Sequence, residues 1–209
     1  NFNNELGLSL TVFRLREEDE MAVLEMGIDD FGQMHRLAKI ARPETAVITN
    51  IGWCHLENLK TRDGILKAKT EVFAHMPASG RVILNGDDDK LQQVDTLGME
   101  KHFFGLQGQE FFGSAIAGHV DHVDALLHTP QWEHAVSIPI PGEHNVYNAL
   151  AATAAGTLLG LSEQEILAGI EQVETIAGRN HFIEAHGMTV IDDCYNANPV
   201  SMRASLEVL

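Results

Sequence analysis

The sequence has 209 residues, which is enough for one domain with a sizeable apolar core, or for one domain with a small appendage. Apolar residues make up 44% and charged residues 21%, a globular composition that excludes a disordered chain, a collagen-like repeat and a coiled coil. The formal net charge of -16 argues against binding to nucleic acid or to an anionic membrane. An anionic ligand therefore needs a metal ion, a helix N-terminus or a local positive site.

Cysteine content and apolar stretches bear on the compartment. Cys54 and Cys194 are the only two cysteines, so we expect free thiols in a reducing, cytoplasmic compartment. The longest apolar stretches, such as residues 149–160, are shorter than the roughly 20 residues of a membrane helix, and the N-terminus has no basic signal-peptide start. These observations predict a soluble protein without membrane insertion. The chain starts without methionine and stops inside an apparent helix, so both ends look cut.

The first two thirds of the chain alternate between strand and helix patterns. The expected elements are a buried strand at residues 22–26, a helix at 34–40 before Pro43, a strand at 45–50, a helix at 63–76 and a strand at 81–85. This order implies right-handed crossovers and a largely parallel sheet.

Short antiparallel strands are expected next, because residues 119–127 and 133–140 alternate between apolar and polar. Helical patterns follow at residues 146–159 and from a capping box at Ser162 and Glu165 to about residue 173. A hairpin at 182–193 and a helix at 201–209 complete the chain. The simplest account is one continuous α/β domain, a largely parallel sheet flanked by helices with a small antiparallel extension.

Polar residues at strand ends mark a first candidate site, because ligands of open parallel sheets bind beyond the carboxyl ends of the strands. Glu25 ends one expected strand, Thr49 and Asn50 end the next, and His55 follows five residues later. If the two strands are adjacent, Glu25 and His55 converge. A carboxylate there needs a metal ion or a salt bridge to Arg36, Arg42 or a lysine, and both interpretations remain open. Lys69 follows on a helix, where spacing alone indicates a solvated lysine like Lys67.

A second group of candidates lies in the C-terminal third. Residues 142–145 precede a helix whose N-terminal amides could receive an anion or a purine edge, although Asn145 could equally be only the N-cap. Asp193 ends a strand, and Tyr195 and Asn196 lie in the polar loop after it. This arrangement is typical of a ribose-binding acid with its loop, or of a simple turn rich in Asn and Pro.

A zinc site at His119, Asp121, His122 and Asp124 is not favoured by the sequence. Residues three apart in a strand face opposite sides, which separates His119 from His122. No cysteine or further histidine stands at ligand spacing. The GxSxG, GxGxxG and Walker A patterns are also absent.

An ordered set of short motifs resembles the Mur ligases, the ATP-dependent amide ligases of peptidoglycan assembly. The matching stretches run through nearly the whole chain and are weakest at residues 97–140; they are residues 1–7, Leu24-Glu25-Met26-Gly27, 40–43, 47–52, His55-Leu56-Glu57, Ala68-Lys69-Thr70-Glu71, 142–148, Gly178-Arg179, 192–199 and 201–203. Each motif alone is weak, and the ordered set is strong.

The resemblance implies a role for each matching residue. Glu25 and His55 match ligands of a Mg²⁺ ion, and Lys69 matches the lysine that the family carbamylates to give oxygen ligands suited to that ion. Nucleotide contacts for ATP are implied at Asn145, Arg179, Asp193, Tyr195 and Asn196. Contacts with the UDP-muramoyl substrate are implied at Asn3, Asn4, Thr49 and Asn50.

The resemblance also implies the reaction. The Tyr195–Pro199 segment and the Asn-rich start favour the dipeptide-adding branch, which joins UDP-MurNAc-tripeptide and D-alanyl-D-alanine through an acyl phosphate in cell wall biogenesis. Residues 1–209 would be its central domain without the phosphate loop, the UDP-binding N-terminal domain and the C-terminal domain, and inactive alone. The alternatives are another Mur-type ligase, amino-acid-adding or folylpolyglutamate-type, and a non-catalytic nucleotide-binding module.

Overall fold

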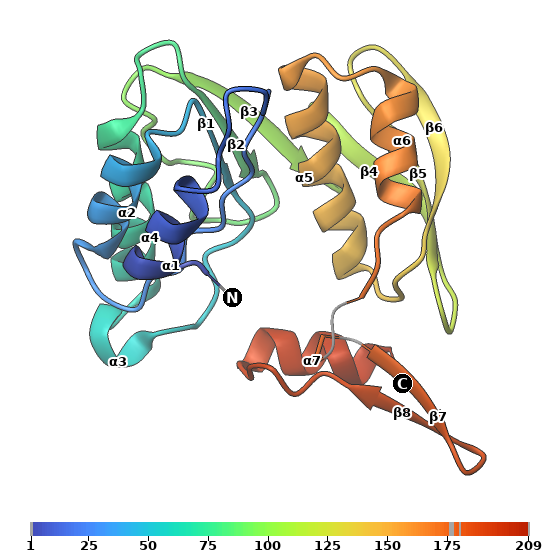
Figure 1. The fold of residues 1–209 in the computed structure, drawn as a ribbon. Coiled ribbons are helices and arrows are strands. Elements are labelled where there is room, and N and C mark those ends of the chain that lie inside the picture. Colours follow the sequence, from blue (N-terminus) through green and yellow to red (C-terminus); the bar gives the residue numbers. More distant parts are fainter. Residues whose placement is uncertain (1, 176–177, 180, 209) are drawn as a thin grey trace. The chain divides into compact units, whose positions relative to one another are not determined.

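The structure is a computed structural model that describes residues 2–175, 178–179 and 181–208 (Figure 1). The chain divides into two compact units. Unit 1 comprises residues 1–83 and 88–101, and unit 2 comprises residues 84–87 and 102–209. Six strands are hydrogen-bonded in the order β1-β2-β3-β4-β5-β6, and β7 and β8 form a separate two-stranded sheet. The α/β fold class, a largely parallel sheet flanked by helices with a small antiparallel part, is confirmed.

Unit 1 contains most of the expected alternating elements. Its helices are α1 (Glu5–Val12), α2 (Gln33–Ala41), α3 (Leu56–Leu59), α4 (Arg62–Thr70) and the 3-10 helix η1 (Glu71–His75), and its strands are β1 (Thr45–Ile48) and the first part of β2 (Arg81–Asn85). Helix α2 buries Met34, Leu37 and Ala38, which the helical period of 3.6 residues places on one face. The expected helix at 63–76 is thus divided into α4 and η1.

Helix α2 receives its N-terminal cap from a distant residue. Gly32 occupies the N-cap position with a left-handed φ of 77° and has no side chain that could cap the helix. The Glu71 carboxylate, on η1, accepts hydrogen bonds from the backbone N–H of Gly32 at 2.9 and 3.0 Å and from that of His35 at 3.2 Å. A carboxylate here also suits the positive end of the helix dipole.

The strand expected at residues 22–26 is wrong. This segment has no regular secondary structure, and Val23 is 97% exposed. A backbone hydrogen bond follows directly after this segment, where the Gly27 N–H donates to the Asn3 carbonyl at 2.9 Å. A short apolar run has the length of a buried strand, but it becomes a strand only if neighbouring strands hydrogen-bond to it and cover it, and composition does not show this.

Unit 2 contains the antiparallel part of the sheet. Its elements are the later part of β3 (Glu100–Gly105), then β4 (Phe111–Gly118), β5 (Val123–His128), β6 (Glu133–Ile138), α5 (His144–Leu159), α6 (Glu163–Glu171), β7 (His181–Ala185), β8 (Met188–Asp192) and α7 (Pro199–Glu207). Strands β3 and β4 pair in parallel, whereas the β4–β5, β5–β6 and β7–β8 pairs are antiparallel. The expected antiparallel strands, hairpin and helices are therefore present.

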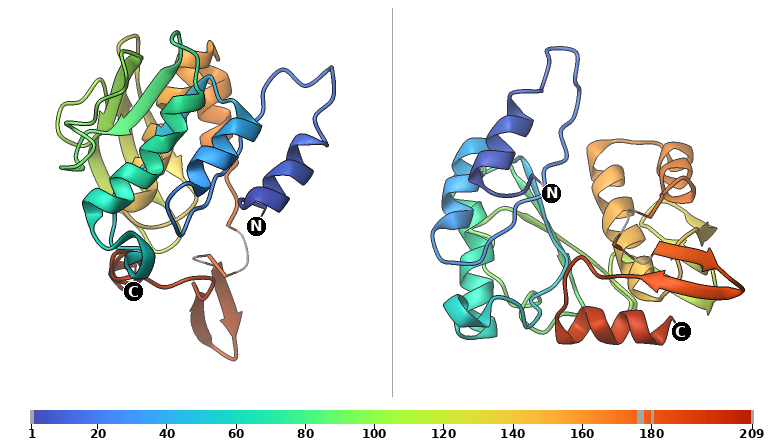
Figure 2. Two further views of the ribbon diagram at one scale, coloured as in Figure 1. Left: turned by 90° about the vertical axis from the view of Figure 1, so that its left-hand side faces the viewer. Right: turned by 60° about the horizontal axis from the view of Figure 1, so that its bottom comes forward.

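Helices α5 and α6 pack on the strands of unit 2. Helix α5 contacts β4, β5 and β6, and α6 contacts β6 and α5, so the two helices lie side by side (Figures 1 and 2). Phe104, Phe111, Leu127 and Leu150 are fully buried in this layer. The capping box is confirmed, since Ser162 Oγ accepts from Glu165 N and the Glu165 carboxylate accepts from Ser162 N.

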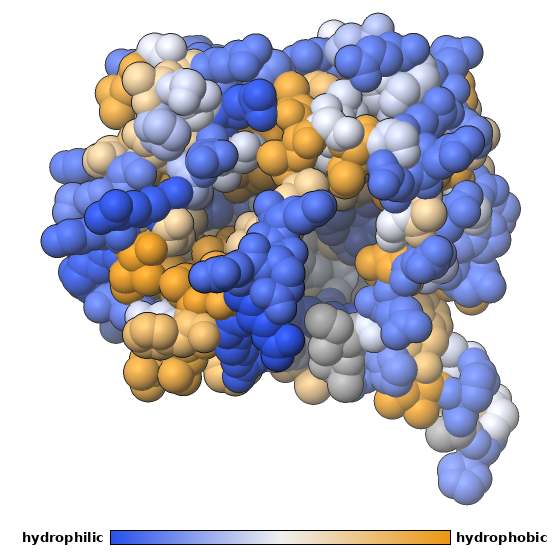
Figure 3. Space-filling model, turned by 45° about the horizontal axis from the view of Figure 1, so that its top comes forward, coloured by the Kyte–Doolittle hydropathy of each residue, from blue (hydrophilic) through white to orange (hydrophobic). Residues whose placement is uncertain are grey.

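Apolar residues at the surface occur as separate patches among hydrophilic ones on the face drawn in Figure 3. None of the helices in the described part of the chain combines the length and the apolar character needed to cross a bilayer. Cys54 is half-buried and Cys194 is exposed, and both are free thiols.

Candidate functional site

Lys69 differs from an ordinary surface lysine. It lies in the last turn of α4, a helix that Thr61 caps by accepting a 3.0 Å hydrogen bond from Gly64 N. Lys69 is half-buried, and its Nζ donates to the Asn50 carbonyl at 2.9 Å, whereas Lys67 is exposed. Burial lowers the pKa of Lys69, although nearby Cys54 and Asp88 act to raise it. The structure thus separates two lysines that spacing alone could not distinguish.

The loop that presents Asn50 is held by two charged residues from other segments. Asp88 Oδ2 accepts from Ile51 N at 2.7 Å, and Arg62 Nε donates to Ile51 O at 2.7 Å. Arg62 Nη2 also lies 3.4 Å from Asp88 and 2.6 Å from Asp89. Because both backbone groups of Ile51 are held, the neighbouring carbonyl of Asn50 is fixed in front of Lys69. Nothing in the sequence pattern indicates this role of Asp88 and Arg62.

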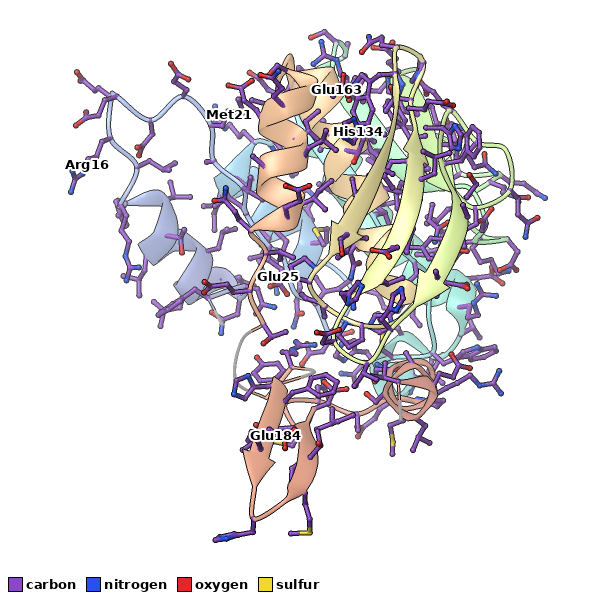
Figure 4. All side chains as sticks on the ribbon, turned by 90° about the vertical axis from the view of Figure 1, so that its right-hand side faces the viewer. Arg16, Met21, Glu25, His134, Glu163 and Glu184 are labelled. Atoms are coloured by element: carbon purple, nitrogen blue, oxygen red, sulfur yellow. The ribbon has the colours of Figure 1, made fainter. Side chains whose placement is uncertain are left out.

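Asn3 and Glu25, to which the resemblance gives different roles, lie in contact. Asn3 Nδ2 donates to Glu25 Oε1 at 2.9 Å. Arg36, one of the cations considered as a partner for Glu25, forms an ion pair with Glu5 at 2.5 Å. Figure 4 labels Glu25 among the side chains. Asn4 has a defined local role, since its side chain caps α1 by accepting from Gly7 N at 2.8 Å.

His55 is exposed and has a left-handed backbone conformation with φ 55°. Its carbonyl accepts from Asn58 N and Leu59 N, so it begins α3. A non-glycine residue with positive φ is uncommon, and such residues cluster at functional sites. Thr49 and Asn50, also exposed, follow directly after β1. Unit 1 therefore carries Asn3, Asn4, Glu25, Thr49, Asn50, His55 and Lys69, whose assigned roles stay predictions.

The second group of candidates lies in unit 2, around the segment between β8 and α7. The Arg179 guanidinium lies 4.4 Å from the centre of the Tyr195 ring. Tyr195 N donates to the Gly178 carbonyl at 3.1 Å, and Gly178 N donates to Asp192 Oδ2 at 3.1 Å. These contacts bring together a cation and an aromatic ring that are 16 positions apart in the sequence. Asn196 Oδ1 accepts from Ala197 N at 2.9 Å.

Asp193 is engaged from two sides within the same unit. Ser205 Oγ of α7 donates a hydrogen bond to Asp193 Oδ2. Burial lowers the pKa of His144, at the start of α5, while Asp193 and Glu207 act to raise it. The Asp193 carboxylate therefore favours the protonated form of His144 at the beginning of α5.

Asn145 is not the N-cap of α5, because Glu143 occupies that position. The Asn145 side chain is buried, with Nδ2 donating to the Pro141 carbonyl at 2.9 Å and Oδ1 accepting from Asn148 Nδ2 at 3.1 Å. The alternative reading of Asn145 as a cap is thus wrong. Its prediction as an adenine contact stays a prediction.

Asp87 and Tyr147 form a polar contact that the sequence did not suggest. Asp87 Oδ2 accepts from Leu106 N at 2.6 Å and from the Tyr147 hydroxyl at 3.0 Å, while Asp87 Oδ1 is buried without a hydrogen-bond partner. Burial, together with the hydrogen bond to Asp87, raises the pKa of Tyr147. No spacing rule in the sequence connects residues 60 positions apart.

Comparisons with known proteins identify the family of the chain. Residues 1–156 match the model of the Mur ligase middle domain. The chain is 37% identical over 214 aligned residues to UDP-N-acetylmuramoyl-tripeptide–D-alanyl-D-alanine ligase of Bacillus subtilis, covering 100% of this chain and 45% of that protein. The Escherichia coli protein of the same name is 34% identical, with 100% and 47% covered. The chain thus spans about half the length of the curated relatives it matches.

Solved structures give the same result. The crystal structure of MurF from Acinetobacter baumannii is similar with a TM-score of 0.95 and 39% identity, covering 100% of this chain and 46% of that one. The MurF ligase of Thermotoga maritima in complex with ADP has a TM-score of 0.89 and 27% identity, with 100% and 49% covered.

Proposed function

Because the chain belongs to the Mur ligase family, in which it matches the middle domain, we propose that it serves as the central domain of an ATP-dependent amide ligase. The substrates are UDP-MurNAc-tripeptide and D-alanyl-D-alanine. The observation that carries this proposal is the similarity of the whole chain to relatives named for that reaction, at 37% and 34% identity.

Unit 1 contributes the groups for a Mg²⁺ ion in this proposal. Glu25 offers carboxylate oxygens and His55 an imidazole nitrogen. An ammonium at Lys69 would repel the ion, but burial lowers its pKa and favours the neutral amine. The neutral Nζ can attack CO₂ and release a proton, giving a carbamate whose oxygens suit Mg²⁺. The carboxylate and carbamate oxygens therefore suit the ion, which when bound would neutralise negative charge on the transferring phosphoryl group.

Unit 2 contributes the nucleotide contacts. Arg179 supplies positive charge for a phosphate or ribose, and Asp193 can accept from ribose hydroxyls. Tyr195 and Asn196 line the same loop, and Asn145 is the proposed adenine contact. The stacking of Arg179 on Tyr195 supports this assignment because it orders two of the proposed ligands before nucleotide arrives.

The proposed reaction proceeds by acyl activation. The terminal carboxylate of the tripeptide attacks the γ-phosphorus of ATP, and ADP leaves. The amine of D-alanyl-D-alanine then attacks the acyl carbon, inorganic phosphate leaves, and the amine loses a proton as the amide forms. Asn3, Asn4, Thr49 and Asn50 would orient the muramoyl substrate. We propose that the 209 residues alone are inactive, which is supported by their covering only 45–47% of the first two relatives.

Substrate profiling of the full-length protein tests the proposal. ATP-dependent phosphate release should require UDP-MurNAc-tripeptide and D-alanyl-D-alanine, and meso-diaminopimelate, lysine or glutamate should not replace the dipeptide. Preference for a single amino acid or a folate-type acceptor would instead identify another ligase of the superfamily.

Substitutions in the full-length protein separate the ligase from a non-catalytic nucleotide-binding module. Glu25→Ala, His55→Ala and Lys69→Ala should each greatly reduce turnover. Lys67→Ala is the matched control, because Lys67 is exposed on the same helix. Its ammonium group lies over the Phe31 ring, 5.8 Å from the ring centre. Added bicarbonate should restore activity lost on stripping CO₂ if Lys69 is carbamylated. Indifference to all three substitutions would refute the proposed metal site.

A further inference from the structure

The tip of the β4–β5 hairpin gathers two imidazoles and a carboxylate. One ligand atom from each of His119, His122 and Asp124 lies within 4.8 Å of the other two, in the single such cluster of three or more His, Cys, Asp or Glu residues among the described residues. These residues belong to unit 2, and none of them is among the residues assigned to the ligase reaction.

A tight turn brings His119 and His122 together, contrary to the sequence-based prediction. As one strand, residues 119–127 would place His119 and His122 on opposite sides. In the structure β4 ends at Gly118, which pairs with Val123, and His119 N donates to His122 O at 2.9 Å. The two histidines therefore face each other across the turn, and their rings stack with centroids 4.1 Å apart. Asp124, two residues after His122, lies on the same side of β5.

The distances are those of a nearly formed metal site. His119 Nε2 lies 3.2 Å from Asp124 Oδ2, and His122 Nε2 lies 3.7 Å from Asp124 Oδ1. With metal–ligand bonds of about 2.0–2.1 Å, two ligand atoms of a tetrahedral zinc site lie about 3.3 Å apart. The separation of His119 Nε2 and Asp124 Oδ2 matches this spacing, and that of His122 Nε2 and Asp124 Oδ1 is slightly longer.

A fourth residue orients one of the imidazoles. His122 Nδ1 lies 2.6 Å from Asp121 Oδ1. An ionised carboxylate accepts, so Nδ1 is the nitrogen that donates, and Nε2 is the nitrogen left to bind a metal ion. This carboxylate–histidine arrangement is the usual outer contact of metal-binding histidines.

We propose that His119, His122 and Asp124 bind one borderline divalent transition-metal ion, of which Zn²⁺ is the representative, with Asp121 as a positioning residue. Two nitrogens and one oxygen favour such an ion over Mg²⁺, which prefers oxygen ligands throughout. Three protein ligands leave a fourth position for water. The ion would fasten the ends of β4 and β5, and the site is independent of the proposed ligase function.

Calorimetric titration of tag-free, full-length protein with Zn²⁺ tests this site. The wild type should bind one Zn²⁺ that excess Mg²⁺ does not displace. His119→Gln, His122→Gln and Asp124→Asn should each weaken this binding about tenfold or more, and Asp121→Asn should weaken it by about tenfold through His122 alone. Unchanged circular dichroism of each variant without metal would exclude misfolding, and Asp121→Asn supplies a test that leaves the three ligands in place.

His134→Gln is the matched control. His134 Nδ1 lies 2.8 Å from Glu163 Oε1, so it has the same type of carboxylate partner, and the two residues lie near one another in Figure 4. His134 is not part of the His119–His122–Asp124 cluster, so its substitution should leave the Zn²⁺ affinity unchanged. Absence of saturable binding, wild-type affinity in His119→Gln and His122→Gln, or displacement by Mg²⁺ would each overturn the proposal.

Discussion

Asp88→Asn should loosen the segment that faces Lys69. Asp88 has a side chain only 8% exposed, and its carboxylate accepts from the backbone N–H of Ile51 at 2.7 Å, of Lys90 at 2.9 Å and of Leu91 at 3.2 Å. An asparagine oxygen can still accept from Lys90 and Leu91, but the amide nitrogen then faces Ile51 N, and two donors oppose each other. Ile51 is 0% exposed, so its N–H would lose a charge-assisted bond without gaining water.

The expected cost of this substitution is about 2–3 kcal/mol, the range for losing a hydrogen bond to a charged group and leaving a buried donor unpaired. Native-state hydrogen exchange at the Ile51 amide measures it directly, with a fall in protection of about 30- to 150-fold. In the full-length protein, the proposed ligase turnover should fall as well, because the Asn50 carbonyl is no longer held in front of Lys69.

Asp89→Asn is the control for this experiment. Asp89 binds the same Arg62 at 2.6 Å, but its side chain is 67% exposed, so its removal should leave the protection of Ile51 unchanged. If Asp88→Asn also leaves the Ile51 amide protected as in the wild type, the assignment of Asp88 as the residue that holds this loop is wrong.

Three further substitutions test unit 2. Ser162→Ala removes the N-cap of α6 and should cost about 1 kcal/mol in urea unfolding, whereas Ser201→Ala should not affect α6. Tyr147→Phe removes a donor to Asp87 and should cost about 1.5 kcal/mol by the same assay; an unchanged midpoint would contradict that role. Burial lowers the pKa of His144, so the unfolded chain binds that proton more readily, and stability should fall as the pH drops below 6.5. The thermal unfolding midpoint of His144→Gln should depend less on pH in this range than that of the wild type. The same pH dependence in both proteins would refute this role of His144.

Elements that depend on local pattern were predictable from the sequence. The capping box needs only Ser162 and Glu165 three residues apart, and α2 needs only apolar residues at helical spacing. The strand at residues 22–26 failed because strand formation depends on a partner strand elsewhere. Similarly, the facing of His119 and His122 depends on where β4 stops, and a boundary shift of a few residues reverses which side chains meet.

The candidate site was predictable only in part, and mainly through motif order. Spacing could not separate Lys69 from Lys67, since the difference comes from burial and from the Asn50 carbonyl 19 positions away. The roles of Arg62 and Asp88 were not predictable, because both side chains bind backbone groups of Ile51. Such contacts do not depend on the identity of the Ile51 side chain, so the sequence pattern does not indicate them. Arg179 and Tyr195 were both named from motifs, but their stacking is a property of the folded loop.

The Glu71 carboxylate at the start of α2 has a consequence for the folding kinetics of unit 1. The N-cap residue of α2, Gly32, has no side chain that could cap the helix. The acceptor for its backbone N–H is instead the carboxylate of Glu71, 39 positions later in the sequence. While that loop is open, the first turn of α2 lacks its acceptor, so the helix should stay frayed in early intermediates and consolidate only when η1 docks. A long-range contact of this kind slows the search for the native state, and it couples the last step of helix growth to tertiary assembly.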